Sequence, residues 1–266
     1  MITTVKRALR NLLWSATGLF LAALVLFAVW ILYPLANSVS YIKTTHKVVA
    51  LTFDDGPYPV FTEQILDVLA EHGVKATFFV TGSYLQQHPE LARRAVAEGH
   101  ELANHGWDGS LLALQSSADI EKALAETDRL IAAAGGPANP HFRPGRAALG
   151  LLGKAVVEQR PGHMILGDTG AVDWVRPGWE NVNCPIPITA LCPTQDGQAI
   201  YMDLKNSVRA GSIVVLHDGY DAGPGAYRGG TVEAVSLFVP ALLEKHFRFL
   251  TVSELLAHPD AARSLD

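Results

Sequence analysis

The chain has 266 residues, a mass of 28.6 kDa and a net charge of −5, and 49% of its residues are hydrophobic. This length allows one large domain or two small ones, and the composition excludes an intrinsically disordered chain. Residues 1–35 hold three basic side chains and no acidic one, which leaves the rest of the chain with a net charge of −8. That charge argues against a nucleic-acid partner, because such binding depends on basic surface that neutralises phosphates.

An uncharged segment of 21 residues, from Leu12 to Leu32, predicts one transmembrane helix. At 1.5 Å per residue it spans the roughly 30 Å of hydrocarbon in a bilayer. Trp14 and Trp30 lie near its ends, where aromatic side chains favour the membrane interface. The alternatives are a cleaved signal peptide, whose apolar region is normally shorter, and a buried core helix.

Basic residues precede this segment and set its expected orientation. They are Lys6, Arg7 and Arg10, and no comparable cluster follows the segment closely. The positive-inside rule therefore places the N-terminus in the cytoplasm and residues 36–266 outside. We expect a single-pass protein of the cytoplasmic membrane with an extracytoplasmic domain. The predicted division is a tip and anchor over residues 1–35, a linker over 36–46, one domain over 47–258 and a tail over 259–266.

Beyond the anchor, the hydrophobic pattern predicts strands that alternate with helices. The expected strands are Val48–Phe53, Ala76–Val80, His100–Asn104, a short one near His141-Phe142, Met164–Gly167, Ile213–His217 and Phe247–Thr251. The expected helices are Phe61–His72, Pro89–Glu98, Ala118–Ala134, Ala147–Gln159, Thr231–Lys245 and Val252–Ala257. About seven such units predict an α/β fold whose strands pair in parallel, because each crossover needs a dozen residues or more. The fold is then a barrel or a doubly wound open sheet.

Polar side chains follow the predicted strands at their carboxyl ends. They are Asp54, Asp55, His105, Arg143, Asp168 and His217. In a parallel β/α fold these ends lie on one face, so residues far apart in sequence converge there. This preference for one end of the strands predicts an enzyme.

The residue types at these ends suit metal-assisted hydrolysis of an acyl group. Asp55 and His105 supply oxygen and nitrogen ligands for a divalent metal such as zinc, which activates a bound water. Asp54 could accept a proton from that water, and the Gly56-Pro57 turn gives the bend that two neighbouring aspartates need. Arg143 could hold Asp54 in its ionised form, and His217 could protonate a leaving group.

Five segments in order resemble the motifs of the polysaccharide deacetylase family, the NodB-homology domains of carbohydrate esterase family 4. They are TFDDGP (Thr52–Pro57), GHELANH (Gly99–His105), FRPGR (Phe142–Arg146), DW (Asp173-Trp174) and LHDG (Leu216–Gly219). The ending FRFLTVSELL (Phe247–Leu256) is also similar. The resemblance covers roughly residues 46–257, and five ordered motifs are far more specific than one.

The resemblance implies a distorted (β/α) barrel and removal of N-acetyl groups from N-acetylglucosamine-containing polysaccharide, such as peptidoglycan, chitooligosaccharide or surface polysaccharide. It implies Asp54 as general base, oriented by Arg143, and His217 as general acid, held by Asp173. It implies Asp55 and His105 as metal ligands. The implied substrate contacts are Trp174, Leu216 and the backbone of Arg146. The implied cofactor is a divalent metal, most readily zinc, with cobalt or nickel as alternatives.

The chain departs from the family pattern where the second metal histidine is expected. The family motif His-(Ser/Thr)-x-x-His here ends on Gly109, which has no side chain to bind a metal. The usual Pro-aromatic pair of the third motif is Gly145-Arg146. Either two protein ligands and waters hold the metal, or another residue fills the position, or the domain binds glycan without cleaving it. The candidate replacements are Asp108, His141 and His163, of which Asp108 is nearest in sequence.

Two cysteines, Cys184 and Cys192, lie in a proline-rich stretch. In an oxidising compartment outside the cytoplasm this pair can form a disulfide, and the alternative is two small buried thiols.

Overall fold

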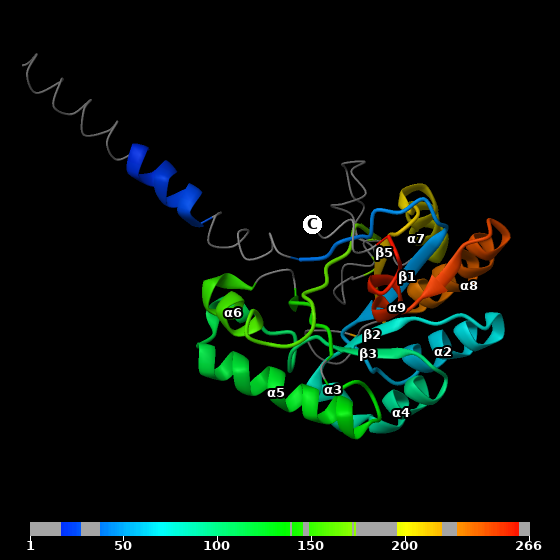
Figure 1. Ribbon diagram of the computed structural model, residues 1–266, viewed down its shortest axis with the longest axis horizontal. Helices are drawn as coiled ribbons and strands as arrows, with labels where there is room; N and C mark the ends of the chain where they lie inside the picture. The colour runs from blue at the N-terminus through cyan, green and yellow to red at the C-terminus, as the bar shows by residue number, and fades with distance from the viewer. Residues whose placement is uncertain are drawn as a thin grey trace, which may run out of the picture.

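The structure, a computed structural model, describes residues 17–27, 38–138, 140–145, 149–171, 173, 196–219 and 228–260. Over these residues strands alternate with helices, as the sequence predicted (Figure 1). The strands are β1 (Val48–Asp54), β2 (Thr77–Val80), β3 (Glu101–Asn104), β4 (Thr169–Gly170), β5 (Ile213–His217) and β6 (Arg248–Leu250). The α-helices are α2 (Phe61–His72), α3 (Gly82–Gln87), α4 (Pro89–Ala97), α5 (Ser117–Ala133), α6 (Gly150–Val157), α7 (Gly197–Ser207), α8 (Gly229–Glu244) and α9 (Val252–Leu256), with a 3-10 turn at Leu112–Leu114.

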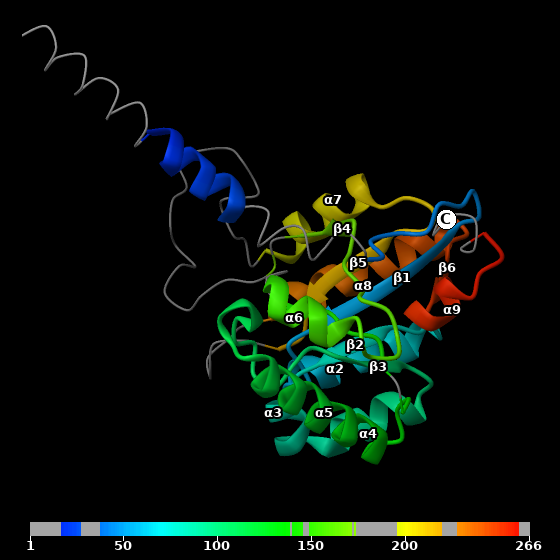
Figure 2. The same ribbon diagram turned by 60° about the vertical axis from the view of Figure 1, so that its left-hand side comes forward.

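All six strands pair in parallel, in the order β3-β2-β1-β5-β4, and β6 pairs with the start of β1. Helices α2 and α8 pack against each other on the same face of β1, and α7 packs beside α8 (Figures 1 and 2). The register matters for function, because Asp54 at the end of β1 lies directly opposite His217 at the end of β5. The predicted α/β fold with a parallel sheet is confirmed.

The strand count differs from the expected seven. The segments predicted as strands at His141-Phe142 and Met164–Gly167 form only isolated bridges, from Asn104 to Phe142 and from Phe142 to Met164. Pro140 and Pro144 flank the first segment, and proline has no N–H to donate to a ladder. The two-residue strand β4 begins at Thr169, just beyond the predicted strand Met164–Gly167. The bridges continue the parallel pairing from β3 toward β4.

Alternation along β1 places its side chains in two different clusters of the core. Val49, Leu51 and Phe53 belong to the larger cluster, which includes apolar residues of α2 and α8. Val48 and Ala50 belong to a second cluster with residues of the other strands. Because side chains alternate between faces of a strand, Asp54 continues the face of Ala50 and lies at its carboxyl end.

Local signals in the sequence explain where the predicted helices end. Helix α2 ends on Gly73, which adopts a left-handed conformation with φ 62° that suits glycine. Helix α9 begins with a capping box in which the Thr251 side chain accepts from the backbone N–H of Glu254. Helices α3 and α7 were not predicted. The former has six residues and no side-chain hydrogen bond at its N-cap, so it carries little signal.

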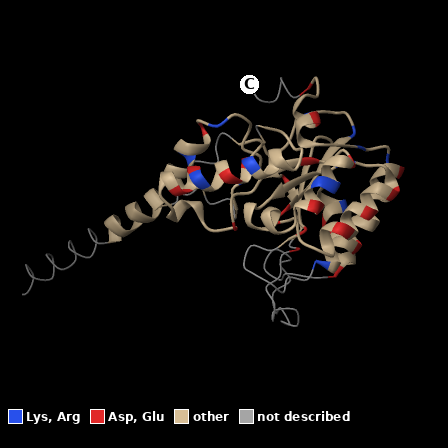
Figure 3. Cartoon of the chain, turned by 90° about the horizontal axis from the view of Figure 1, so that it is seen from below, with Lys and Arg blue, Asp and Glu red and all other residues tan. Residues whose placement is uncertain are grey.

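Residues 17–27 form a helix that has no charged side chain, so it is uniformly tan in Figure 3. Its large apolar side chains are exposed, including Leu19 at 72% and Phe20 at 63%. Within the described ranges, no helix has both the length and the apolar character that a membrane crossing requires. Residues 12–16 and 28–32 of the predicted span lie outside the described residues.

Candidate active site

Asp54 ends β1 with its carboxylate buried against Arg143. The Arg143 Nη1 donates to Asp54 Oδ1 at 2.5 Å and to the Thr52 hydroxyl at 2.9 Å. The same guanidinium donates to the carbonyl oxygens of Ile165 and Leu166, at 3.3 and 3.0 Å. A charge-assisted hydrogen bond from a guanidinium that three other acceptors hold in place fixes the orientation of the Asp54 carboxylate. The expected pairing of Arg143 with Asp54 is therefore present.

Asp55 and His105 lie together beside Asp54. Asp55 adopts a positive φ of 74°, and the following Gly56-Pro57 peptide is cis, so the predicted bend after β1 is present. The bend brings Asp55 Oδ1 to 3.3 Å from His105 Nε2, while Asp54 Oδ2 lies 4.0 Å from the same nitrogen. These donors, a carboxylate oxygen and an imidazole nitrogen, can share one divalent cation.

The electrostatics of this pair favour a positive charge at His105. Burial alone lowers the pKa of the imidazole, but the carboxylates of Asp54 and Asp55 outweigh burial and raise it. For Asp55, burial raises the pKa, but the hydrogen bond and the charge of His105 lower it to about 2. The pair therefore provides an ionised carboxylate and a place where a proton or a metal cation is stabilised.

Gly109 lies close to His105. A Cβ atom added at Gly145 would be 3.9 Å from both Gly109 Cα and His105 Nε2. Among the residues that the structure describes, no cluster of three or more metal-ligating side chains replaces the missing histidine. Asp108, expected as the nearest replacement, is exposed, and its Oδ1 accepts from the Ser110 backbone N–H at 3.1 Å. That expectation is corrected, because Asp108 forms no metal-ligating group with Asp55 and His105.

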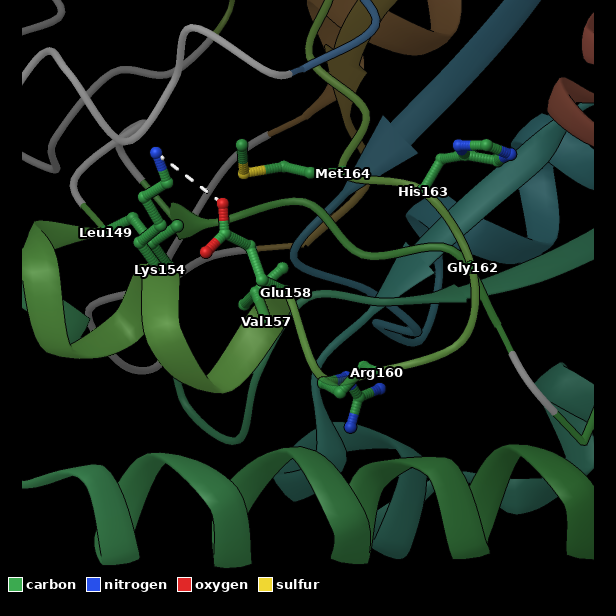
Figure 4. A pocket seen from close by; sticks show the side chains of 8 residues that line it. All are labelled: Leu149, Lys154, Val157, Glu158, Arg160, Gly162, His163 and Met164. Atoms are coloured by element: carbon green, nitrogen blue, oxygen red, sulfur yellow. Dashed lines mark ion pairs between the residues drawn. The ribbon is translucent and has the colours of Figure 1, made fainter.

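The two other candidate replacements also lie elsewhere. His141 Nε2 lies 3.1 Å from the Ser253 hydroxyl on α9, and its Nδ1 accepts from the backbone N–H of His163. His163 lines a small cavity of about 140 Å³ beside α6. Figure 4 shows its ring extending away from the Lys154–Glu158 ion pair in the same cavity, whose charged atoms are 3.5 Å apart. The two imidazole rings lie 5.6 Å apart, and neither belongs to a metal-ligating group with Asp55 and His105 among the described residues.

His217 ends β5 and is held by Asp173. The Asp173 carboxylate lies 2.7 Å from His217 Nδ1 and accepts from the His217 backbone N–H at 2.8 Å. Burial alone lowers the pKa of this imidazole, but the Asp173 charge and hydrogen bond outweigh burial and raise it to about 9. At neutral pH His217 is thus a protonated imidazolium whose Nε2 is available as a proton donor.

Sequence reasoning missed the residues that support Asp173. The Thr231 hydroxyl donates to Asp173 Oδ2 at 2.9 Å, and Arg228 Nη1 donates to the Asp173 carbonyl oxygen at 3.2 Å. The Arg228 Nε also donates to the Gly219 carbonyl oxygen at 2.8 Å, and Arg228 is almost fully buried. The available signal was an arginine beside two glycines, immediately before the helix predicted over Thr231–Lys245.

Asp218 was also missed, although it lies next to His217. It is fully buried, its Oδ2 accepts from the Thr62 hydroxyl at 2.6 Å, and its Oδ1 has no partner among the described residues. Burial raises its pKa to about 7. Its backbone N–H donates to the Asp54 carbonyl oxygen at 3.1 Å, so the turn after β5 is joined to the end of β1.

The expected role of Leu216 in an acetyl pocket is corrected. Leu216 has no exposed area and packs in the larger core cluster, on the face of β5 opposite His217. Val215, two residues before His217, shares the face of His217 and is half-buried.

Asp168 has a structural role, since its carboxylate accepts hydrogen bonds from the Arg209 side chain and from the Ile213 backbone N–H. The predicted residues Trp174, Arg146, Cys184 and Cys192 lie outside the described residues.

The comparisons with known proteins agree with this geometry. The chitooligosaccharide deacetylase of Sinorhizobium fredii is 38% identical over 207 residues, which are 75% of this chain and 87% of that protein. The peptidoglycan-N-acetylglucosamine deacetylase of Bacillus cereus is 30% identical over 223 residues, 82% of this chain and 92% of that one. The structure of the peptidoglycan deacetylase PdaC from Bacillus subtilis matches with a TM-score of 0.65 and 28% identity, over 81% of this chain and 93% of that one.

Residues 41–157 also match the family described as polysaccharide deacetylase. That range contains Asp54, Asp55, His105 and Arg143. The family match and the two relatives, which align with most of this chain, lead to the same conclusion as the parallel β/α fold. The chain belongs to the polysaccharide deacetylase family of hydrolases.

Proposed function

We propose that the chain is a membrane-anchored, exported, metal-dependent hydrolase that removes N-acetyl groups from N-acetylglucosamine-containing polysaccharide. One observation carries the proposal: a carboxylate held by Arg143 and an imidazolium held by Asp173 are register partners on adjacent strands, with the Asp55–His105 pair beside them. The bridges at Phe142 and Met164 support a distorted barrel over residues 47–258.

The two held groups divide the proton transfers of amide hydrolysis. Asp54, oriented by Arg143, accepts a proton from the attacking water. His217, kept protonated by Asp173, donates a proton to the leaving amine nitrogen, so that the sugar departs as an amine and acetate is released. The two roles differ because the partner of Asp54 is the cationic Arg143, whereas the partner of His217 is the anionic Asp173.

A divalent metal fits the chemistry of the donor pair, with Asp55 and His105 as its protein ligands. When bound, such an ion polarises the amide carbonyl and the attacking water. Zinc suits one oxygen and one nitrogen ligand best, and cobalt or nickel suit them too. With Gly109 at the third family position, we expect weaker metal affinity than three side chains would give.

The substrate proposal follows the names of the relatives, which act on chitooligosaccharide and on peptidoglycan N-acetylglucosamine. Export is supported by the uncharged residues 12–32, by the basic residues that precede them and by the exposed apolar side chains of residues 17–27. A catalytic domain on the extracytoplasmic side would reach wall or surface polysaccharide.

The test uses the full chain purified in detergent, supplied with zinc or cobalt and given chitotetraose or peptidoglycan. We expect acetate release that an Asp54→Asn variant lowers by at least about a hundredfold, since loss of a positioned general base typically costs this much. Absence of release above that variant, across both substrates and both metals, would count against the proposal.

The second candidate is a glycan-binding domain without turnover, and Gly109 is the observation that favours it. This candidate predicts less than stoichiometric metal in the purified protein and glycan binding that a chelator does not change. The Gly109→His variant is expected to bind zinc more tightly, measured by metal titration. Gly109→Ala is the matched control, because Gly109 has a φ of 73° and any side chain there introduces the same backbone strain without a ligand. Stoichiometric zinc in the wild type, lost in His105→Ala, would reject this candidate.

A further inference from the structure

A cavity of about 510 Å³ lies beside the candidate active site, at the same end of the strands. It is lined by Trp107, Asp108 and Ser110 of the loop that follows His105 and by Gln115, Asp119, Lys122, Ala123 and Glu126 in and before the first turns of α5. In a β/α unit the helix starts at the carboxyl end of the strand that it follows, so the loop after His105 and the first turn of α5 lie on the catalytic face. The volume falls within the roughly 300–1,000 Å³ of small-ligand pockets.

The wall that carries Trp107 is fixed in place. The backbone N–H groups of Gly82 and Ser83 donate to the carbonyl oxygens of Gly106 and Trp107, at 2.9 and 2.8 Å. The Thr127 hydroxyl of α5 donates to the Gly106 carbonyl oxygen at 3.0 Å. The Trp107 ring rests on Gly82, where an added Cβ would come within 2.8 Å of two ring carbons. The cavity is therefore preformed, with little ordering cost on binding.

Trp107 is half-buried and lines the cavity. One face of a pyranose ring carries only C–H groups, which pack on the face of an aromatic ring, while the sugar hydroxyls need polar partners around it. Gln115 and Ser110 provide amide and hydroxyl groups in the same cavity, and the Gln115 side chain already donates to the Ser110 hydroxyl at 2.6 Å. This combination suits a neutral sugar unit.

The charged lining residues disfavour an anionic ligand. Three carboxylates, Asp108, Asp119 and Glu126, line the cavity against the single cation of Lys122. Arg129 pairs with Glu126 at 2.7 Å but does not line the cavity. A carboxylate on the ligand would therefore meet like charges at close range, and this repulsion is screened by salt.

We infer that this cavity binds the sugar unit next to the one that is deacetylated, and that it selects a neutral unit over one that bears a carboxylate. The inference rests on the proposed function and narrows its substrate class. A chitooligosaccharide places a neutral N-acetylglucosamine in the cavity. A peptidoglycan strand places N-acetylmuramic acid there, whose lactyl group ends in a carboxylate when it carries no peptide. The preferred substrate is thus the chitooligosaccharide type.

The experiment compares two tetrasaccharides of equal length, chitotetraose and the alternating N-acetylglucosamine–N-acetylmuramic acid oligomer without peptide. Affinity is measured with the full-length Asp54→Asn protein in detergent, and acetate release is measured with the wild type. We expect chitotetraose to bind roughly three- to tenfold more tightly at 20 mM salt, and the difference to shrink at 1 M salt, where charges more than about 3 Å apart are screened. Equal affinities at low salt would overturn the inference.

Variants separate the charge from the aromatic contact. The double variant Asp119→Asn, Glu126→Gln is expected to bind the anionic oligomer more tightly than the wild type does. Its affinity for chitotetraose is expected to stay the same, so the two ligands then bind about equally well. Glu71→Gln, at an exposed position on α2, is the matched control that leaves the ratio unchanged. Trp107→Ala is expected to weaken chitotetraose binding more than tenfold, and Trp107→Phe to restore most of it. An unchanged ratio in the double variant, or unchanged binding in Trp107→Ala, would contradict the subsite.

The two proposals fail in different ways. Absence of acetate release with discrimination intact would reject the hydrolase and leave the subsite in place. Acetate release at equal kcat/KM for both oligomers, unaffected by salt, would reject the subsite and leave the hydrolase in place.

Discussion

Asp54 and His217, which lie opposite each other at the ends of β1 and β5, have partners of opposite charge. Arg143 donates to Asp54 from a guanidinium that is itself held by backbone carbonyl oxygens, so the orientation of the Asp54 carboxylate is fixed. Asp173 accepts from both the ring and the backbone of His217, so the imidazole keeps its proton. In the proposed mechanism, Arg143 and Asp173 therefore distinguish the base from the acid, and each can be changed without replacing Asp54 or His217.

Replacing Asp173 by Asn tests the assignment of His217 as the acid. The pKa of His217 is raised from an ordinary value of 6.5 to about 9, so the protonated form persists up to about pH 9 and activity is lost above it. The neutral amide of the variant removes the negative charge beside His217, so burial then lowers the pKa of His217. The alkaline limb of the kcat/KM profile is therefore expected to move to lower pH by more than one unit. Profiles from pH 5 to 10 provide the measurement.

Thr231 supplies the matched pair of controls for this profile. Thr231→Ser keeps the hydroxyl that donates to Asp173 and is expected to keep the wild-type limb. Thr231→Val removes it and is expected to lower kcat by roughly fivefold, the equivalent of one hydrogen bond of about 1 kcal/mol. A profile that stays in place in Asp173→Asn would mean that another group is the acid.

Asp218 predicts a pH dependence of stability. Its pKa is raised from 3.8 to about 7, so between these values the folded state binds more protons than the unfolded state and the free energy of unfolding falls as pH rises. The loss reaches on the order of 4 kcal/mol by pH 7. Asp218→Asn cannot ionise and is expected to remove this part of the slope.

Urea unfolding of the chelated protein at pH 4.5 and 7.5 measures that slope. Glu71→Gln, which changes an exposed carboxylate, should reproduce the wild-type slope. If Asp218→Asn and the wild type lose the same free energy over this interval, then Asp218 is ionised throughout and another group accounts for the loss.

The residues that sequence could identify are those at strand ends. Asp54, Asp55, His105, Arg143, Asp173 and His217 each stand in a short motif, and the structure brings them together. Arg228, Thr231 and Asp218 act through hydrogen bonds across distant loops, which no local pattern records. Leu216 was misplaced because a motif gives an order of residues but not the strand face, whereas alternation from His217 indicates Val215.

At the scale of elements, the carboxyl ends of β1 and β5 are held together by close backbone contacts. The backbone N–H groups of Asp218 and Gly219 both donate to the Asp54 carbonyl oxygen, at 3.1 and 3.3 Å. An added Cβ at Gly219 would lie 2.1 Å from the Asp55 carbonyl oxygen. The two loops therefore approach as closely as they do because glycine stands at one of them.

Gly219→Ala tests this contact. Because the clash is with backbone and not with a flexible side chain, we expect a loss of about 1–3 kcal/mol in the free energy of unfolding and a lower kcat/KM as Asp55 is displaced. Gly145→Ala is the control for stability, since the nearest atom to its added Cβ is 3.8 Å away, and it should change stability by less than about 0.5 kcal/mol. Equal stabilities of the two variants would show that the loops adjust freely.

Elements with strong periodicity were predictable and those without it were not. The bounds of α2 and β5 agree with the prediction residue for residue, because apolar spacing and a terminal glycine or histidine define them. The two-residue β4 and the six-residue α3 are too short to show a period. The bridges at Phe142 and Met164 were overestimated as strands because apolar residues flanked by proline or glycine resemble short strands.

At the scale of the whole molecule, the described helix over residues 17–27 differs from the rest of the protein. All its residues are exposed and none is charged, whereas α2, α5 and α8 each bury a face against the core. Exposed apolar surface of this kind is unfavourable in water, so it requires lipid or protein as a partner. The uncharged run of 21 residues around it provides the length that a bilayer requires.

The anchor prediction is tested by fractionation of cells that express the full chain. We expect the protein in the membrane pellet after alkaline carbonate and 1 M salt, with release only by detergent, and digestion of residues 36–266 by protease added from outside. The double variant Leu21→Lys, Leu24→Lys places two charges at the helix centre, at roughly 2.5–3.5 kcal/mol each, and should release the protein. Leu151→Lys, Leu152→Lys changes two exposed leucines of α6 and should leave it in the pellet. Carbonate extraction of the wild type would reject a spanning anchor, whereas a pellet-bound protein protected from external protease would reject the predicted orientation alone.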